Sequence, residues 1–298
     1  MIRIVFLGTS DAVPSEKRNH TAVFFSYNNE NILMDCGEGT QRQIRIAKLN
    51  PCSITKILIS HWHGDHVLGI PGLLQSMALN GYNKQLDIYG PEGTKKFIEE
   101  IFNLFVFASD KLNIKVHEVN GKFFENDDFF LISEKMSHGC PSNAYSFVLK
   151  EKIRIDKKKL KKYKIDAGPW LQDLKKGKDI TYNKRKIKSK DVTFLQNGKK
   201  ISIIMDTGFN NKILPFVKDA DLLISESSFL DEDSEKAKLY KHLTAKQAAE
   251  TAKKAKVKKL ILTHVSQRYT KNIGKVEKEA RKIFKNSKLA EDFMEIIV

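Results

Sequence analysis

The chain has 298 residues, and its 52 lysines and arginines outnumber its 36 acidic residues, which gives a formal net charge of +16. Hydrophobic residues make up 41% of the chain, enough for a sizeable core, so the composition excludes a disordered protein. No apolar run approaches the roughly 20 residues of a membrane-spanning helix, and the N-terminal run ending at Gly8 is too short for a secretory signal. Cys36, Cys52 and Cys140 are too widely spaced for a disulfide framework and favour a reducing compartment. We therefore expect a globular, cytoplasmic protein with no membrane partner.

Apolar runs and amphipathic stretches alternate along the chain, a pattern typical of α/β proteins. Apolar strands are expected directly before Asp35, His61, Asp206 and His264, and over residues 143–150. Thr244, with Gln247 three residues later, predicts a capping box at the start of a helix. Helical apolar spacing occurs over residues 38–48, 65–80, 92–107, 244–256 and 275–285.

Two segments of the first half of the chain are repeated in the second half. The run that ends in Asp35-Cys-Gly resembles the run that ends in Asp206-Thr-Gly, and the strand before His61 resembles the strand before His264. Continuous apolar runs of this kind are typical of strands covered on both faces. The chain therefore resembles two related α/β halves. Because ligands bind beyond the carboxyl ends of parallel strands, these four residues are expected near a functional site.

One segment, residues 150–190, holds a large part of the excess positive charge. It contains 17 basic and five acidic residues, a net charge of +12 that leaves only +4 for the rest of the chain. Such a concentration favours a polyanionic partner, whereas a generally lysine-rich genome would explain an even excess. With few aliphatic residues the segment cannot build a large core. We expect an inserted arm with one or two short helices.

The strongest local motif is Ser60-His61-Trp62-His63-Gly64-Asp65-His66. Three imidazoles and a carboxylate at the end of a strand, with a glycine that permits a tight turn, are typical of a metal site. His138, Asp206 and His264 are further candidate ligands, although His138 and His264 also fit buried structural histidines. Five histidines and two aspartates suffice for two metal ions that share a carboxylate. Ligands without thiolate suit zinc, with manganese or iron as alternatives.

These residues resemble the metallo-β-lactamase superfamily, whose motif His-x-His-x-Asp-His stands here at His61, His63, Asp65 and His66. The resemblance implies a four-layer αββα fold from two related halves, a single domain over residues 1–298 with the basic arm at 150–190 inserted. Within the superfamily the chain resembles ribonuclease Z, a zinc-dependent endoribonuclease that removes the 3′ trailer from precursor tRNA. The supporting motifs are Leu7-Gly-Thr-Ser10, Asp35-Cys-Gly-Glu-Gly-Thr-Gln41, Ser137-His-Gly139, Gly168-Pro169, Glu226-Ser-Ser-Phe229 and His242-Leu-Thr244.

The resemblance also implies a role for each candidate site residue. Asp65 would orient or deprotonate the attacking water, and hydrolysis would leave a 3′-hydroxyl on the tRNA. His242 would protonate or stabilise the leaving oxygen, with Glu226 as its carboxylate partner. Two Zn²⁺ ions per subunit would be held, one by His61, His63 and His138 and the other by Asp65, His66 and His264, with Asp206 as the bridge.

A loop that contacts the acceptor end in this family is only partly matched. The family pattern is Pro-x-Lys-x-Arg-Asn, and the chain has Pro14-Ser-Glu16-Lys17-Arg18-Asn19, so Pro14, Arg18 and Asn19 match while Glu16 replaces the lysine. Arg18 and Asn19 are therefore the RNA-binding candidates in this loop. The departure leaves open whether precursors that carry CCA are rejected.

In the family the arm grips the elbow of the tRNA, and in a homodimer the arm of one subunit serves the active site of the other. Tyr163 and Trp170 would either stack on the RNA or pack the small helices of the arm against each other. Lysines act mainly as neutralisers of phosphate charge, so they supply affinity with little sequence preference. The RNA-binding candidates in the arm are Lys157, Lys158, Lys159, Lys161, Lys162, Gly168, Pro169, Lys175 and Lys176.

Two other functions fit parts of the sequence. One is a small-molecule phosphodiesterase or another hydrolase of the same fold, in which the basic arm would serve a different purpose. The other is a nucleic-acid-binding protein whose metal site is structural or vestigial. The full set of seven ligands argues against the binding protein. The arm argues against the small-molecule hydrolase, because small substrates need no distant anchor.

Overall fold

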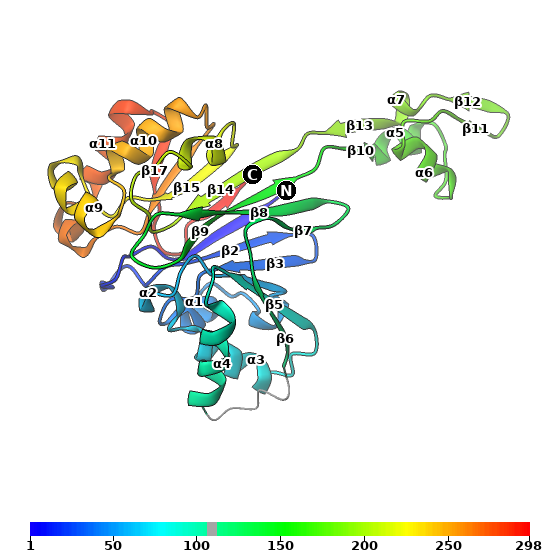
Figure 1. The fold of residues 1–298 in the computed structure, drawn as a ribbon. Coiled ribbons are helices and arrows are strands. Elements are labelled where there is room, and N and C mark those ends of the chain that lie inside the picture. The colour runs from blue at the N-terminus through cyan, green and yellow to red at the C-terminus, as the bar shows by residue number, and fades with distance from the viewer. Residues whose placement is uncertain (106–111) are drawn as a thin grey trace.

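A computed structural model of the chain describes residues 1–105 and 112–298. Two seven-stranded sheets face each other, and helices cover the outer face of each sheet, so the predicted four-layer αββα fold is confirmed (Figure 1). The first sheet has the order β18 (Glu295–Ile297), β1 (Arg3–Gly8), β2 (Ala22–Tyr27), β3 (Glu30–Met34), β4 (Lys56–Leu58), β5 (Gln85–Gly90) and β6 (Asn113–Glu118). The second sheet has the order β17 (Ser287–Leu289), β16 (Leu260–Thr263), β15 (Leu222–Glu226), β14 (Lys199–Ile204), β9 (Ser142–Leu149), β8 (Phe129–Met136) and β7 (Gly121–Glu125).

The apolar runs of the strands serve two cores at once. Along β1, Ile4 and Phe6 pack between the two sheets, whereas Val5 and Leu7 pack under the outer helices. Successive side chains of a strand point to opposite faces, so a strand covered on both sides must be apolar throughout. A third core lies under the helices of the second sheet. This double burial fixes the strand ends from which the site residues extend.

Each predicted helical range contains a helix, one of these ranges is interrupted, and the helices Ile213–Val217 and Ser234–Tyr240 lie outside all of them. The range 65–80 forms two helices because Gly69 lies against the backbone of Gly37 and Pro71 starts a new helix. Thr244 forms the predicted capping box with Gln247. Of the predicted range 92–107, residues 106 and 107 lie outside the described residues. The outer helices are α1 (Thr40–Ile46), α2 (Gly64–Val67), α3 (Ile70–Leu79), α4 (Thr94–Leu104), α8 (Ile213–Val217), α9 (Ser234–Tyr240), α10 (Ala245–Lys254) and α11 (Gly274–Ile283), with single 3₁₀ turns at Pro51–Ser53 and Asp231–Asp233. Among the described helices none has both the length and the apolar composition needed to cross a membrane.

The two halves are related, but the repeated strands do not occupy equivalent positions in the two sheets. β3 and β14 each lead into the parallel part of a sheet, in keeping with the likeness of the segments that end at Asp35 and Asp206. β4 pairs directly with β3, whereas β15 separates β16 from β14. His61 and His264 therefore follow similar strands in different sheet positions, which a comparison of local sequence does not reveal.

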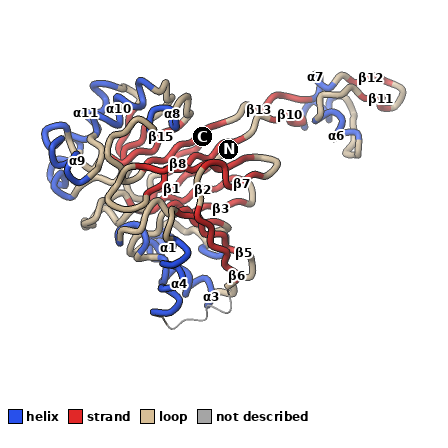
Figure 2. Tube along the Cα trace, in the orientation of Figure 1, coloured by secondary structure: helices blue, strands red, loops and turns tan. Residues whose placement is uncertain are grey.

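Residues 152–196 form a projection that extends away from both sheets (Figures 1 and 2). Two strands paired antiparallel, β10 and β13, make its stalk, and a small lobe lies at its tip. The lobe has its own core of Leu160, Ile165, Leu174, Ile187 and Val192. Its elements are β10 (Lys152–Ile155), α5 (Lys157–Lys162), α6 (Trp170–Lys175), β11 (Ile180–Tyr182), β12 (Arg185–Ile187), α7 (Ser189–Val192) and β13 (Thr193–Gln196).

The small core of the lobe makes its stability depend on single residues. Leu174 is fully buried, and replacing a buried leucine by alanine costs about 2–5 kcal/mol. We expect Leu174→Ala to unfold the lobe while the midpoint of thermal unfolding of the two-sheet body stays unchanged. Limited trypsin digestion followed by mass spectrometry measures this as faster cleavage within residues 157–190. Leu195→Ala is the control, because the Leu195 side chain on the stalk is 54% exposed, and it should digest like the unmodified protein. Equal digestion of both variants would contradict the dependence on this core.

Candidate metal centre

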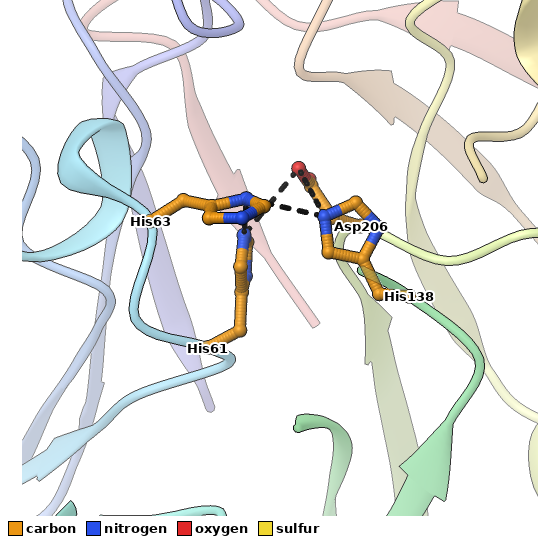
Figure 3. Close-up of side chains that lie close together, drawn as sticks. All are labelled: His61, His63, His138 and Asp206. Carbon is orange, nitrogen blue, oxygen red and sulfur yellow. Dashed lines mark hydrogen bonds and ion pairs between the residues drawn. The ribbon is translucent and has the colours of Figure 1, made fainter. Parts of the chain in front are cut away.

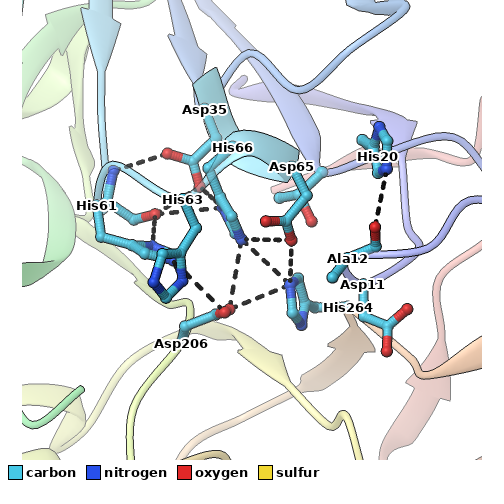
Figure 4. Close-up of polar contacts among 12 residues, drawn as sticks. Asp11, Ala12, His20, Asp35, His61, His63, Asp65, His66, Asp206 and His264 are labelled. Carbon is cyan, nitrogen blue, oxygen red and sulfur yellow. Dashed lines mark hydrogen bonds and ion pairs between the residues drawn. The ribbon is translucent and has the colours of Figure 1, made fainter. Parts of the chain in front are cut away.

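The loop after β4 carries four of the candidate ligands within six residues. His61 and His63 lie in this loop, and His63 is the N-cap of the short helix α2 that contains Asp65 and His66. Asp65 and His66 are buried, and His61 is completely buried. The tight turn into α2 therefore directs all four side chains towards one volume, which is open to solvent at His63, the one exposed residue of the four (Figure 4).

The remaining candidate ligands follow three strands of the second sheet. His138 follows β8, Asp206 follows β14 and His264 directly follows β16. The backbone of His264 has φ = 55°, in the left-handed region that non-glycine residues seldom adopt. Side chains from both sheets thus meet where their strand ends face each other.

The candidate ligands form two groups that share Asp206. In the first group, His61 Nε2 lies 3.0 Å from His63 Nδ1, which lies 3.2 Å from His138 Nε2, and Asp206 Oδ2 is 3.6 Å from His61 Nε2 (Figure 3). One ligand atom from each of these four residues lies within 4.8 Å of all the others. Three imidazole nitrogens and a carboxylate oxygen at such distances are typical of a four-coordinate zinc site before its ion is bound.

The second group consists of Asp65, His66 and His264 together with Asp206 (Figure 4). His66 Nε2 lies 3.1 Å from His264 Nε2, and Asp65 Oδ2 lies 3.2 Å from each of these nitrogens. Asp206 Oδ1 is 3.2 Å from His264 Nε2. The two oxygens of Asp206 therefore face different groups, the arrangement that a bridging carboxylate requires.

The rings of His61 and His66 are anchored through Nδ1, the nitrogen that faces away from the centre. His66 Nδ1 donates a hydrogen bond to Asp35 Oδ2 at 2.7 Å. Ser60 Oγ donates to the same oxygen at 2.8 Å and lies 3.0 Å from His61 Nδ1, from which it accepts. Since each Nδ1 carries the proton, each Nε2 presents its lone pair to the centre. Asp35, which has φ = 56°, thus orients two ligands without belonging to either group.

Two further histidines are anchored in the same way. His138 Nδ1 donates to the backbone oxygen of Lys241 at 3.0 Å. His264 Nδ1 donates to Ser228 Oγ at 2.9 Å, and that hydroxyl donates to Glu226 Oε2 at 2.7 Å. All four anchored imidazoles therefore offer Nε2 as the ligand atom, which is the usual arrangement behind metal-binding histidines.

The electrostatics of the cluster favour positive charge at its centre. Burial by itself lowers the pKa of His66, but surrounding carboxylates, with Asp206 first among them, raise it well above its usual value. Burial by itself raises the pKa of Asp206, but the imidazoles of His264 and His66 hold it well below its usual range. The carboxylates that stabilise a proton on His66 would equally attract a divalent cation.

One atom in the cluster lacks a partner that a cation would supply. Asp206 Oδ1 is buried and accepts no hydrogen bond from any described residue, although His264 Nε2 is nearby. A buried polar atom without a partner is costly, and here it lies where both groups meet. Nitrogen and oxygen donors converge on this position, so the residues present fit divalent metal ions.

His242 and Glu226 lie beside the second group and complete a hydrogen-bonded chain. Glu226 is fully buried; its Oε1 accepts from the Thr207 amide at 2.7 Å, and its Oε2 lies 3.0 Å from His242 Nδ1. Burial by itself lowers the pKa of His242, but the Glu226 carboxylate raises it to about 9. Because both oxygens of Glu226 already accept hydrogen bonds, this pair is suited to hold a proton on His242 and not to bind a further metal.

The two candidates in the N-terminal loop make intramolecular contacts. Arg18 Nη1 donates to Thr9 Oγ1 at 2.8 Å and to the Ala290 backbone oxygen at 2.7 Å, so this nitrogen ties the loop to the C-terminal segment. Asn19 Nδ2 donates to the Glu38 backbone oxygen at 2.7 Å. Both residues therefore shape the loop, and an RNA contact by either of them stays a prediction.

The lysine candidates of the projection are exposed, whereas its large aromatic residue is used for packing. Trp170 packs against Tyr182 with 5.2 Å between ring centroids, and its Nε1 donates to the Asp166 backbone oxygen. Tyr163 is 42% exposed. Gly168 and Pro169 form the turn before α6, with Pro169 as the N-cap. The exposed lysines are Lys157, Lys158, Lys159, Lys161, Lys162, Lys175 and Lys176.

The sequence assigned no specific role to three residues of the centre, Asp35, Ser60 and Ser228. Asp35 had a visible signal, since it ends an apolar strand in the same way as Asp206 does. Ser60 and Ser228 had none of their own, because a serine next to a ligand or a glutamate is common in any sequence. Their roles follow only from hydrogen bonds that join separate strands.

The shared carboxylate allows a direct test of the metal centre. We expect Asp206→Asn to lower the metal content of the purified protein, because an amide lacks the charge and the second ligand oxygen that a bridge needs. Elemental analysis after gel filtration measures the metal per chain, and the thermal midpoint with and without added Zn²⁺ measures the linked stabilisation. Asp87→Asn is the control, since Asp87 also lies beside a histidine, His117, at 3.0 Å but outside the cluster. Equal metal content in Asp206→Asn and the unmodified protein would contradict this assignment.

Comparison with known proteins places the chain in a family. The ribonuclease Z of Methanosarcina mazei is 38% identical over 301 residues, covering 100% of this chain and 98% of that protein. The ribonuclease Z of Bacillus velezensis is 39% identical over 310 residues, covering 100% of this chain and 99% of that protein. A family model described as anti-Pycsar protein Apyc1 matches residues 2–104 only.

Solved structures agree with these relatives. The crystal structure of the short form of human tRNase Z has a TM-score of 0.72 and 28% identity, and the alignment covers 99% of both chains. The metallo-β-lactamase fold protein YhfI from Bacillus subtilis has a TM-score of 0.71 at 18% identity, covering 99% of this chain and 98% of that one, a likeness of fold alone. Since the full-length relatives carry the name over the whole length of this chain, the chain is an enzyme of the ribonuclease Z family within the metallo-β-lactamase fold.

Proposed function

We propose that the protein is a zinc-dependent endoribonuclease that removes the 3′ trailer from precursor tRNA and leaves a 3′-hydroxyl on the tRNA. The observation that carries the proposal is the pair of ligand groups that share Asp206, with His242 and Glu226 beside them, in a chain of the ribonuclease Z family. Two Zn²⁺ ions are the proposed cofactors, with manganese or iron as alternatives. The proposal treats residues 1–298 as one catalytic domain with an inserted RNA-binding arm at 150–190.

Each part of the site has a chemical role in this reaction. Two divalent ions would lower the pKa of water and stabilise charge on the phosphate. Burial by itself raises the pKa of Asp65, but the imidazoles of His66 and His264 hold it well below its usual value, so Asp65 remains a carboxylate. This charge suits Asp65 to orient the attacking water, whereas the low pKa makes it a weak base on its own. His242, protonated because of Glu226, can donate a proton to the departing 3′-oxygen of the tRNA.

The projection is the proposed anchor for the tRNA elbow. Its exposed lysines would neutralise phosphates, and its small folded lobe carries them at the end of a stalk. Since the projection extends away from its own two sheets, we propose a homodimer in which the projection of one subunit serves the centre of the other (Figure 1).

The proposed setting of the reaction is the cytoplasm. Cys36, Cys52 and Cys140 are all free thiols, in keeping with a reducing compartment where precursor tRNA is available.

Removal of the lobe separates binding from chemistry. In the proposed variant a two-residue Asn-Gly turn replaces residues 156–192 and joins Ile155 to Thr193, which are partners in the antiparallel stalk. We expect cleavage of precursor tRNA to fall by orders of magnitude, while hydrolysis of bis(p-nitrophenyl) phosphate stays unchanged. Steady-state kinetics on both substrates check this. Loss of neither activity would contradict the anchor, and a protein active only on the small diester before any change would be a small-molecule phosphodiesterase.

A mixing experiment tests the homodimer with the same variant. The lobe-deleted chain keeps its centre, and an Asp65→Ala chain keeps its lobe. If the lobe acts across the dimer, subunit exchange between the two inactive proteins restores tRNA cleavage. Absence of rescue, when mixed dimers are shown by mass spectrometry, would mean that each lobe serves its own subunit.

Two substrates whose leaving groups differ in their need for a proton test whether His242 acts as a general acid. We expect His242→Ala to lower kcat on precursor tRNA by about 10²–10⁴-fold, because the 3′-oxygen needs a proton as it departs. Hydrolysis of bis(p-nitrophenyl) phosphate should fall far less, since p-nitrophenolate leaves without protonation. His20→Ala is the control, because His20 is a buried histidine outside both ligand groups. Equal losses on the two substrates would assign His242 to a structural role instead.

A further inference from the structure

A second region of high positive charge lies on the catalytic body, and the average over the chain conceals it. Residues 244–288 contain 14 basic and three acidic residues, a net charge of +11. The nearly neutral total outside residues 150–190 arises because the other segments carry an excess of acidic residues. The body therefore has a strongly basic region of its own, formed by α10, α11 and the segments between them.

Three lysines of α11 form a row on its exposed side. Lys275, Lys278 and Lys282 are spaced by three and four residues, so they lie along one face of the helix. Val276 and Ala280 are fully buried on the opposite face. The row is thus directed away from the core into solvent.

The row has no compensating acidic partners. On the flank of α11, Arg281 pairs with Glu277 at 3.1 Å. Among the described residues, no carboxylate forms a salt bridge with Lys275, Lys278 or Lys282. Like charges three and four residues apart destabilise a helix, so the mutual spacing of these lysines does not stabilise α11, although Lys282 lies in the last turn, where positive charge is favourable.

The row continues towards the metal centre through a charged cavity. The 3₁₀ helix η4 (Gln267–Asn272) joins the ligand His264 to α11. A cavity of about 1010 Å³ lies between η4 and the N-terminal loop, and its walls contain three basic residues, Lys17, Arg268 and Lys271, and one acidic residue, Glu16. Arg268 also lies 3.7 Å from Asp233, which offsets part of its charge. Both walls start beside the centre, because Ser10 forms a β-bridge with Val265, the residue after His264. A net excess of basic residues therefore extends from the centre through this cavity and along α11.

We propose that this surface, defined as Lys17, Arg268, Lys271, Lys275, Lys278 and Lys282, binds the phosphate backbone of the RNA trailer on the 3′ side of the scissile bond. The proposal rests on the proposed function. Lysines are flexible point charges, and a row of them suits a single strand without fixed shape. The folded tRNA body already has a separate basic anchor on the projection. We therefore expect the affinity of the protein for a precursor to increase with the length of its trailer.

The test removes three charges without touching the centre. The variant Lys275→Gln/Lys278→Gln/Lys282→Gln keeps helix-forming side chains, and Lys84→Gln/Lys95→Gln/Lys96→Gln is the control that removes three exposed lysines elsewhere. KM and kcat are measured for precursors with trailers of one and of twenty nucleotides over a range of salt concentrations. For the long trailer we expect KM to rise on the order of tenfold and the salt slope to shrink by about 2, since each contact to a single strand contributes about 0.7. With the one-nucleotide trailer, KM should not change.

Other outcomes would overturn the proposal in distinct ways. An equal rise of KM for both precursors would assign the row to the tRNA body, and no change for either would make it a solvated helix face. Binding of a labelled 20-nucleotide single-stranded RNA, measured by fluorescence anisotropy, tests the surface without cleavage. If the unmodified protein binds this RNA and the α11 variant does not, the surface binds single-stranded RNA even when precursor tRNA is not cleaved. Failure of RNA binding by this surface is therefore distinguishable from failure of the proposed function.

Discussion

The buried carboxylate of Asp206 is the contact on which the rest of the site depends. It lies where strand ends from both sheets meet, and its two oxygens face different ligand groups. Without a cation, five imidazoles and the carboxylate of Asp65 would surround the Asp206 carboxylate, whose negative charge is costly to bury. The αββα layers make this arrangement sustainable, because strands buried on both faces hold the ligand loops rigidly. The stability of the fold thereby holds these side chains close together, although their charges and burial would otherwise favour rearrangement or protonation.

Much of this arrangement could be predicted from local sequence, and the remainder depends on which strands become neighbours. Continuous apolar runs predicted the strands, and the closely spaced residues His61 to His66 predicted the ligand loop. The role of Asp35 could not be predicted in the same way, since it requires β3 to lie beside β4. The break between α2 and α3 arises from the contact of Gly69 with Gly37, which is invisible to helical periodicity. Long-range pairing, and not local propensity, decides each of these details.

The distribution of charge gives a more detailed picture than the net value. A single average for the residues outside the predicted arm describes them as nearly neutral, although α10 and α11 carry a basic region of similar strength to the arm. Figure 1 shows the projection and the α10–α11 layer at opposite ends of the molecule. A substrate longer than the body itself could contact both ends at once. Two separated basic regions thus fit a large, partly folded polyanion better than they fit a compact ligand.

Glu226 joins the metal centre to the proposed acid through a single carboxylate. One of its oxygens faces His242 Nδ1 at 3.0 Å and also accepts from Ser228 Oγ, which in turn accepts from His264 Nδ1. The proton positions along this chain are therefore set together: a neutral His264 with its proton on Nδ1 offers Nε2 to the centre, while the same carboxylate stabilises the imidazolium of His242. Ser228 can donate only one hydrogen bond, and Glu226 Oε2 at 2.7 Å is a nearer acceptor than the His264 backbone oxygen at 3.1 Å, so Glu226 favours the direction in which Ser228 accepts from His264 Nδ1. The groups that would activate water and those that would release the tRNA thus depend on one buried carboxylate, and neither half of the site can be oriented independently of the other.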